Sequence, residues 1–453
     1  MSIELIIGLL LQTIAVVLVM FRVRHRRLAY TGLLFVCISV IYSGFTELLQ
    51  IAYPGMNVYR MMVNQYMVDR WLLVVSSAIL IFAMTYSYRV RPLREKHEML
   101  SGATFGFVDW RWGIGVVILL NLTLAGIFGD VDLGYWGGLS EMLPGFTNLI
   151  LLDFILEKKG KYILPLFLYQ SGIGMLSGSR SAVLFSLITL LCVFIRYGVS
   201  IRWRSLILSG ITVLILAVSI SGMRSVVGRY VFADQTNMQR LESLWAGAGV
   251  VLRYGMPTEI MQDIVYRFDG NSFGGLIVAG YEAGIEQAGW TPIINNFFLT
   301  VPSFLNPKKV EAGLFNLNEE DYLVDHFRMS GFKTIELKGE LIETSEIDYI
   351  PGVWGILFGA FGTVGVLFSA ALLGLGFAVM DTWIMRSRSL LAVLIGIGLT
   401  VACLLFEQGI RVFVLTGRAV LALFIVLILF RQAKTILVVG LGINGSQHNK
   451  THL

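Results

Sequence analysis

Charged side chains are scarce in this sequence. They make up only 14% of the 453 residues, whereas hydrophobic residues make up 56%. Soluble domains carry about 25% charged residues. The shortage excludes an ordinary soluble globular protein and predicts a chain that crosses a membrane many times.

Cysteine and histidine are also scarce. The three cysteines, Cys37, Cys192 and Cys403, fall inside apolar segments, which argues against a disulfide framework and a thiolate metal site. The five histidines form no His-x-x-x-His pair. Residues 438–445 match the pattern G-x-G-x-x-G, but only eight residues follow, too few for the remainder of a dinucleotide site. The sequence therefore predicts no metal, no organic cofactor and no nucleic-acid partner.

Long apolar segments dominate the chain. A helix needs about 20 apolar residues to cross the roughly 30 Å of hydrocarbon in a bilayer. Within the apolar segments, Gly355 and Gly359, followed by Gly362 and Gly365, indicate close helix packing. We predict an all-α polytopic fold with about eleven transmembrane helices, at residues 3–21, 29–52, 71–88, 113–128, 143–157, 162–177, 180–195, 205–222, 351–380, 389–406 and 412–430.

The short loops differ sharply in basic residues. One set of alternate loops holds nineteen lysines and arginines, and the opposite set holds five. Because basic loops stay in the cytoplasm, the N-terminus is predicted outside and the C-terminus inside. The chain divides into an eight-span region (1–222), a large outward loop (223–350) and a three-span region with a short cytoplasmic tail (351–453). Within the loop, residues 290–305 are apolar but too short to span, which predicts a re-entrant or interfacial segment.

Arg180 breaks the charge rule in an outward hairpin. It follows Gly178 and Ser179 and opens an apolar segment. Ser177 or Ser179 is suited to cap the following helix, whose free N–H groups then point outward. A guanidinium beside such a helix start favours binding of a phosphate or diphosphate. The alternative is an arginine that merely reaches toward the lipid headgroups.

A second group of charges precedes the last span. Glu407, Arg411 and Arg418 have spacings of four and seven, which predicts roughly one helical face. Arg418 lies about two turns inside an apolar run, where a charge is costly and usually functional. An ion pair between Glu407 and Arg411 is the structural alternative.

The outward loop supplies further candidates. Arg267 and Asp269 are two residues apart and suit an anionic sugar phosphate, or equally an ordinary loop surface. Lys308 follows the short apolar run 290–305. The candidate catalytic residues are thus Glu407, Arg180 and Arg418, and the candidate substrate-binding residues are Arg267, Asp269, Arg411, Ser179 and Lys308.

Outward arginines at a membrane surface suit one chemistry in particular. Nucleotide donors are absent outside the cell, so an activated sugar there must carry its own leaving group. A lipid-linked diphosphate sugar does so, and preorganised arginines stabilise the departing diphosphate without a metal. Glu407 is the candidate base for the acceptor hydroxyl.

Several ordered blocks resemble the Wzy-type O-antigen and oligosaccharide repeat-unit polymerases, particularly the enterobacterial common antigen polymerase branch. The resemblance covers roughly residues 176–430 and is weaker in the acidic insert 310–348. The blocks are Gly178-Ser179-Arg180, Arg267-Phe268-Asp269, the run from Val301 to Pro307 with its lysines, Ile350-Pro351-Gly352, and Glu407 through Arg418.

This resemblance implies a multi-span glycosyltransferase of the GT-C-like class in the bacterial inner membrane, with a periplasmic N-terminus and loop. The family joins repeat units linked to undecaprenyl diphosphate, which serve as donor and acceptor. A chain-length regulator and a flippase are the implied protein partners, and the lipid bilayer surrounds the spans.

Two other functions compete with polymerisation. An O-antigen ligase uses the same donor but is expected to carry an essential histidine in its outward loop, where this chain offers only His326. A transporter or flippase for lipid-linked glycans predicts charges buried along a path through the spans. Asp153 and Arg418 are the residues that keep this second alternative open.

Overall fold

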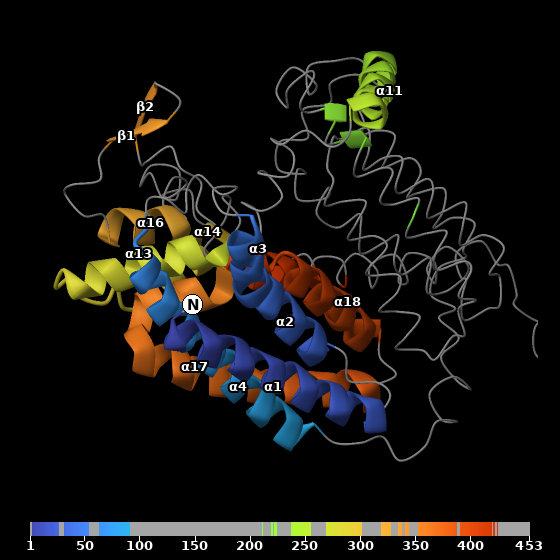
Figure 1. The fold of residues 1–453 in the computed structure, drawn as a ribbon. Coiled ribbons are helices and arrows are strands. Elements are labelled where there is room, and N and C mark those ends of the chain that lie inside the picture. Colours follow the sequence, from blue (N-terminus) through green and yellow to red (C-terminus); the bar gives the residue numbers. More distant parts are fainter. Residues whose placement is uncertain are drawn as a thin grey trace, which may run out of the picture.

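The computed structural model describes a helical bundle assembled from both ends of the chain (Figure 1). The described residues are 2–26, 31–53, 63–90, 211, 219–220, 222–223, 237–254, 269–300, 319–327, 334–337, 340–343, 352–386, 390–418, 420–421 and 424. Most of the predicted spans between residues 113 and 222 lie outside this set. Within it, four helices are long and apolar enough to cross a membrane, which fits the predicted membrane protein. The predicted number of eleven spans is not tested.

The helices agree with the predicted spans to within a few residues at most ends. The long ones are α1 (Ile3–Arg26), α4 (Gln65–Arg89), α17 (Gly352–Arg386) and α18 (Leu390–Leu404). The second span consists of α2 (Thr31–Val40), a π-helical turn η1 (Ile41–Phe45) and α3 (Thr46–Ala52). The described part of the large loop contributes α11 (Asn237–Tyr254), α13 (Gly270–Glu282), α14 (Thr291–Thr300) and α16 (Glu319–Phe327).

One short β-hairpin accompanies the helices of the predicted all-α fold. Strand β1 (Thr334–Leu337) pairs antiparallel with β2 (Glu340–Glu343), so that Leu337 lies opposite Glu340. The hairpin lies within the acidic insert 310–348, where the sequence offered no motif. The described residues are therefore mainly helical with one small sheet.

Helix α4 is the centre of the bundle. It packs against α1, α17 and α13. Midway along α4, Ser76 accepts a hydrogen bond from Gln12 of α1 at 2.9 Å; near the end of α4, the Ser87 carbonyl accepts one from Arg22 at 2.9 Å. α1 and α4 therefore run parallel. This is expected for the first and third of three consecutive spans, because the second span, formed by α2, η1 and α3, runs in the opposite direction.

The two ends of the bundle differ in composition. The basic residues Arg22, Arg89 and Arg386 lie at the ends of α1, α4 and α17. Helices α13, α14 and α16 from the large loop cover the opposite end (Figure 1). This separation agrees with the charge asymmetry of the loops, although the side that faces the cytoplasm stays a prediction.

An aromatic cluster fills the middle of the bundle. Phe35 of α2 lies 4.7 Å from Phe82 of α4, 5.0 Å from Phe377 and 5.5 Å from both Trp354 and Phe406, between ring centroids. Tilted and edge-on contacts of this kind add about 0.5–1.5 kcal/mol per pair to the gain from burial. The cluster therefore joins four segments that are distant in the sequence.

Helix α17 is not one straight span. Gly362 has φ 67° and ψ −168°, a conformation essentially restricted to glycine, and it interrupts the helix. Trp354 before the break and Phe377 after it both contact Phe82 of α4. The chain therefore folds back at Gly362, so that a half-helix (residues 352–361) precedes a long part (residues 363–386). At about 15 Å the half-helix reaches only partway through a bilayer.

The glycines before the break confirm the predicted close packing. A Cβ at Gly355 would lie 2.8 Å from Phe273 of α13, and one at Gly359 would lie 3.0 Å from Leu323 of α16. Helices α13 and α16 of the large loop therefore lie directly on the half-helix. Gly362 is also close to a neighbour, since a Cβ there would lie 2.6 Å from the Gln287 Nε2, but its backbone interrupts the helix, so the predicted span 351–380 is not one continuous helix.

Backbone groups released at the break are paired again by the end of α13 and by the loop that follows it. The Tyr281 hydroxyl donates to the Phe358 carbonyl at 2.6 Å, and the amides of Ala288 and Gly289 donate to the carbonyls of Gly359 and Ala360 at 3.1 and 2.8 Å. Free carbonyls at a helix end need such partners away from water. The loop thereby stabilises the half-helix.

Candidate functional site

The π-helical turn η1 organises the candidate site. A π turn inserts one extra residue into a helix and is frequent at functional sites. Buried Gln12 donates to the hydroxyls of Ser43 in the turn and Ser76 of α4, both at 2.9 Å. A Cβ at Gly44 would lie 2.1 Å from the Gln12 Oε1, so any larger residue there would force the Gln12 side chain to move. These contacts fix the turn against α1 and α4.

Glu407 lies in a break between two helices. After α18 ends at Leu404, residues Phe406–Gln408 form a 3₁₀ turn, and Gly409 has φ 69° before the next helix begins at residue 411. Glu407 therefore does not share a helical face with Arg411 and Arg418, contrary to the sequence prediction. Spacing alone does not show that Gly409, with its positive φ, interrupts the helical geometry between them.

The π turn holds the Glu407 carboxylate. The Tyr42 hydroxyl donates to Glu407 Oε2 at 3.1 Å, and the Tyr42 ring lies 5.6 Å from the ring of Phe406. Phe406 also lies against the start of the half-helix, where a Cβ at Gly352 would approach its Cε1 to 2.8 Å. Three helix irregularities, at Tyr42, Glu407 and Gly352, therefore meet beside one carboxylate.

Arg411 and Arg418 lie on the helix that follows Glu407. They are seven residues apart in the helical stretch 411–418, which places them on the same side of it. The side chain of Arg411 is exposed and that of Arg418 is half-buried. The arginine nearest to Glu407 in the sequence is thus accessible from outside the bundle.

The start of α13 lies against the same π turn. Asp269 caps the helix, since its Oδ1 accepts from the amides of Asn271 and Ser272 at 3.0 and 3.2 Å, and its Oδ2 accepts from the Ser272 hydroxyl. The Asn271 side chain donates to the Ser43 carbonyl at 2.8 Å. The π turn therefore brings together the regions of Asp269 and Glu407.

This geometry gives Asp269 a structural role. The side chain is buried, and both of its oxygens accept from residues of its own helix. Its contribution as a substrate ligand stays a prediction. Of the remaining candidates, Arg180, Ser179, Arg267 and Lys308 lie outside the described residues, as does Asp153.

Two buried carboxylates near the start of α4, Glu47 and Asp69, were missed by the sequence reasoning. Gln65 at the start of α4 donates to Glu47 at 3.0 Å and to Asp69 at 2.8 Å, and Asn271 donates to the second Glu47 oxygen at 3.2 Å. For Glu47 the sequence offered a signal, since an acidic residue inside the apolar run 29–52 is costly and usually functional. Among the described residues, no three histidine, cysteine, aspartate or glutamate side chains gather as a metal site.

His326 lies away from Glu407, near the opposite end of the half-helix. Its Nε2 lies 2.8 Å from the Glu286 carbonyl oxygen, and its ring packs edge-on against Phe327 at 4.9 Å. Phe327 in turn packs on α13, where a Cβ at Gly280 would lie 2.6 Å from it. In these contacts, the only histidine of the sequence 223–350 stabilises the packing of α16 on α13 and the loop that follows it.

Comparisons of the chain with models of protein families, with curated proteins and with solved structures found no match.

Proposed function

We propose that this chain is a membrane glycosyltransferase that joins lipid-linked oligosaccharide repeat units into a surface polysaccharide. In this proposal it is a Wzy-type polymerase, in a bacterial inner membrane, with its large loop in the periplasm. The supporting observation is the Glu407 carboxylate, which Tyr42 holds at a helix break four residues before Arg411 in the sequence. A carboxylate and nearby guanidinium groups are the two kinds of group that the transfer reaction requires.

The reaction uses these groups as follows. Glu407 accepts the proton of the acceptor hydroxyl as its oxygen attacks the anomeric carbon of the donor sugar. A new carbon–oxygen bond forms, and the bond from the anomeric carbon to the diphosphate breaks. The electron pair leaves with the lipid diphosphate, whose charge Arg411 and Arg418, together with Arg180, stabilise. Tyr42 orients the Glu407 carboxylate through its hydrogen bond.

The placement of His326 favours a polymerase over a ligase. A ligase is expected to use a loop histidine at the reacting centre, whereas His326 contacts the Glu286 carbonyl at the far end of the half-helix from Glu407. In the proposed setting, a chain-length regulator and a flippase are the protein partners. Undecaprenyl diphosphate carries both the donor and the acceptor glycan.

Gel analysis of surface polysaccharide from cells with and without this gene tests the proposal. Loss of the long-chain ladder, with single repeat units still attached to lipid or core, is the expected result. Loss of every attached unit with accumulation of lipid-linked polymer would instead indicate a ligase. An unchanged pattern, or repeat units trapped on the cytoplasmic side, would refute glycosyl transfer and indicate a transporter or no role in this polymer.

A further inference from the structure

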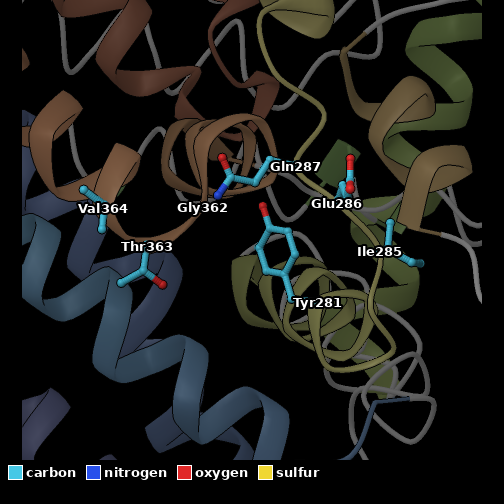
Figure 2. Close-up of a pocket in the computed structure, with 7 residues that line it drawn as sticks. All are labelled: Tyr281, Ile285, Glu286, Gln287, Gly362, Thr363 and Val364. Atoms are coloured by element: carbon cyan, nitrogen blue, oxygen red, sulfur yellow. The ribbon is translucent and has the colours of Figure 1, made fainter.

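A pocket of about 650 Å³ opens at the break in α17, away from Glu407. Its size falls within the roughly 300–1,000 Å³ typical of small-molecule sites. Figure 2 shows the Tyr281 hydroxyl pointing toward Gln287 and the break at Gly362. The lining residues are Tyr281, Ile285, Glu286, Gln287, Gly362, Thr363 and Val364.

The lining suits a polyol better than a phosphate. Thr363 and Gln287 supply a hydroxyl and an amide, which donate and accept hydrogen bonds with sugar hydroxyl groups. Ile285 and Val364 supply apolar surface for the carbon–hydrogen face of a sugar ring. None of the described lining residues is basic, and Glu286 adds negative charge, which disfavours a diphosphate.

The walls of the pocket are held in place by the half-helix cap. Tyr281 donates to the carbonyls of Phe358 and Gly359 at 2.6 and 3.2 Å. Burial raises the pKa of Tyr281 above its ordinary value, so the hydroxyl keeps its proton and continues to donate. His326 contacts the carbonyl of Glu286 at 2.8 Å. The Tyr281 side chain and the Glu286 backbone are thereby held in place, whereas the exposed Gln287 side chain can rotate toward a ligand.

The pocket lies at the apolar margin of the bundle. Val364 is 82% exposed and Trp290, which packs on Phe361 beside the break, is 64% exposed. Phe368, one turn further along α17, is 64% exposed. Large exposed apolar side chains along a predicted span mark the surface that faces lipid. A ligand in the pocket is thus beside the membrane.

The half-helix links the pocket to the proposed reacting centre. Gly352 at its start lies against Phe406, next to Glu407, and Gly362 at its end lines the pocket. Ten helical residues separate these points by about 15 Å along the axis.

We propose that this pocket binds the uncharged saccharide part of a lipid-linked glycan, while the reacting end of that glycan lies near Glu407. The inference rests on the proposed glycosyltransferase function and adds a second, phosphate-free subsite to it. The pocket fixes the position of the glycan relative to the carboxylate, and the arginines bind the diphosphate elsewhere.

Cysteine modification in the purified full-length protein tests the pocket. The variant Val364→Cys puts a thiol in the lining, and Ala283→Cys puts one on the exposed surface at the end of α13, outside the lining. Maleimide labelling at each position is followed by mass spectrometry. The probes are the free oligosaccharide released by mild acid from the cells' own lipid-linked repeat units, and inorganic diphosphate.

The expected result is that the oligosaccharide slows labelling of Val364→Cys at least fivefold and leaves Ala283→Cys unchanged. Adding Gln287→Ala to Val364→Cys should abolish this protection. Protection by diphosphate alone, equal protection at both positions, or none by the oligosaccharide would overturn the pocket assignment. If the gel of surface polysaccharide still shows a polymerase in that case, only the pocket assignment fails; an unchanged gel refutes the proposed function separately.

Discussion

Replacing Gly362 with alanine tests the break in α17. The backbone there has φ 67° and ψ −168°, which an L-residue adopts at a cost of about 1–3 kcal/mol. The added Cβ would lie 2.6 Å from the Gln287 Nε2. Because the Gln287 side chain is exposed, its amide can rotate away, so backbone strain supplies most of the loss. We expect Gly362→Ala to lower the free energy of unfolding by about 1–3 kcal/mol.

Gly376→Ala is the matched control on the same helix. A Cβ at Gly376 has nothing within 4 Å and the helix is regular there, so the change should be neutral or stabilise by up to about 1 kcal/mol. Both variants are unfolded in mixed micelles with increasing SDS, and helix content is followed by circular dichroism. Adding Gln287→Ala to Gly362→Ala should recover little stability. Equal stability of Gly362→Ala and Gly376→Ala would mean that α17 continues as a helix through residue 362.

Changes at four further residues probe the site and its supports. Glu407→Gln should abolish polymer extension while the protein level stays normal, and Tyr42→Phe should reduce extension at least tenfold. Both effects are measured as chain length on a polysaccharide gel. Unchanged chain length in Glu407→Gln would show that Glu407 is not the base. Asp269→Ala removes a helix cap and should lower the free energy of unfolding by about 0.5–2 kcal/mol in the same SDS titration, with partial recovery in Asp269→Asn. A loss of polymer at unchanged stability would instead favour a role of Asp269 in substrate binding. Tyr281→Phe should lower the free energy of unfolding by about 1–3 kcal/mol, because the Phe358 carbonyl loses its hydrogen-bond partner at the buried helix end. An unaltered SDS midpoint would contradict this capping role.

Hydropathy predicted most of the spans that the structure describes. The segments 3–21 and 389–406 became α1 and α18 with small changes at their ends, because desolvation of the backbone forces apolar runs to be helical. The sequence also contains a signal for the break at Gly362, although the predicted span 351–380 was treated as continuous. The apolar run that begins at 351 is far longer than about 20 residues, and a glycine lies in it at the position of the turn.

The contacts of the candidate site were beyond the reach of sequence spacing. Tyr42 and Glu407 are separated by 365 residues, and their pairing depends on how α2 and α18 pack. The acidic cap at Asp269 had a local signal, because aspartate before a helix commonly binds the next free amides. The same local pattern is compatible with Asp269 as the cap of α13 and with Asp269 as a substrate ligand. The sequence therefore could not distinguish these two roles.

The central position of α4 has a consequence for the order of assembly. Gln12 and Ser76 are 64 residues apart, so α1 and α4 can pack early during synthesis. Tyr86 of α4 instead donates to Asp381 of α17 across 295 residues. At about 5–20 residues per second, that partner is made roughly 15–60 s later. During this interval the α17-facing side of α4 has only lipid or other segments against it. The half-helix, the break and the site around Glu407 therefore form last, after nearly the whole chain has been inserted.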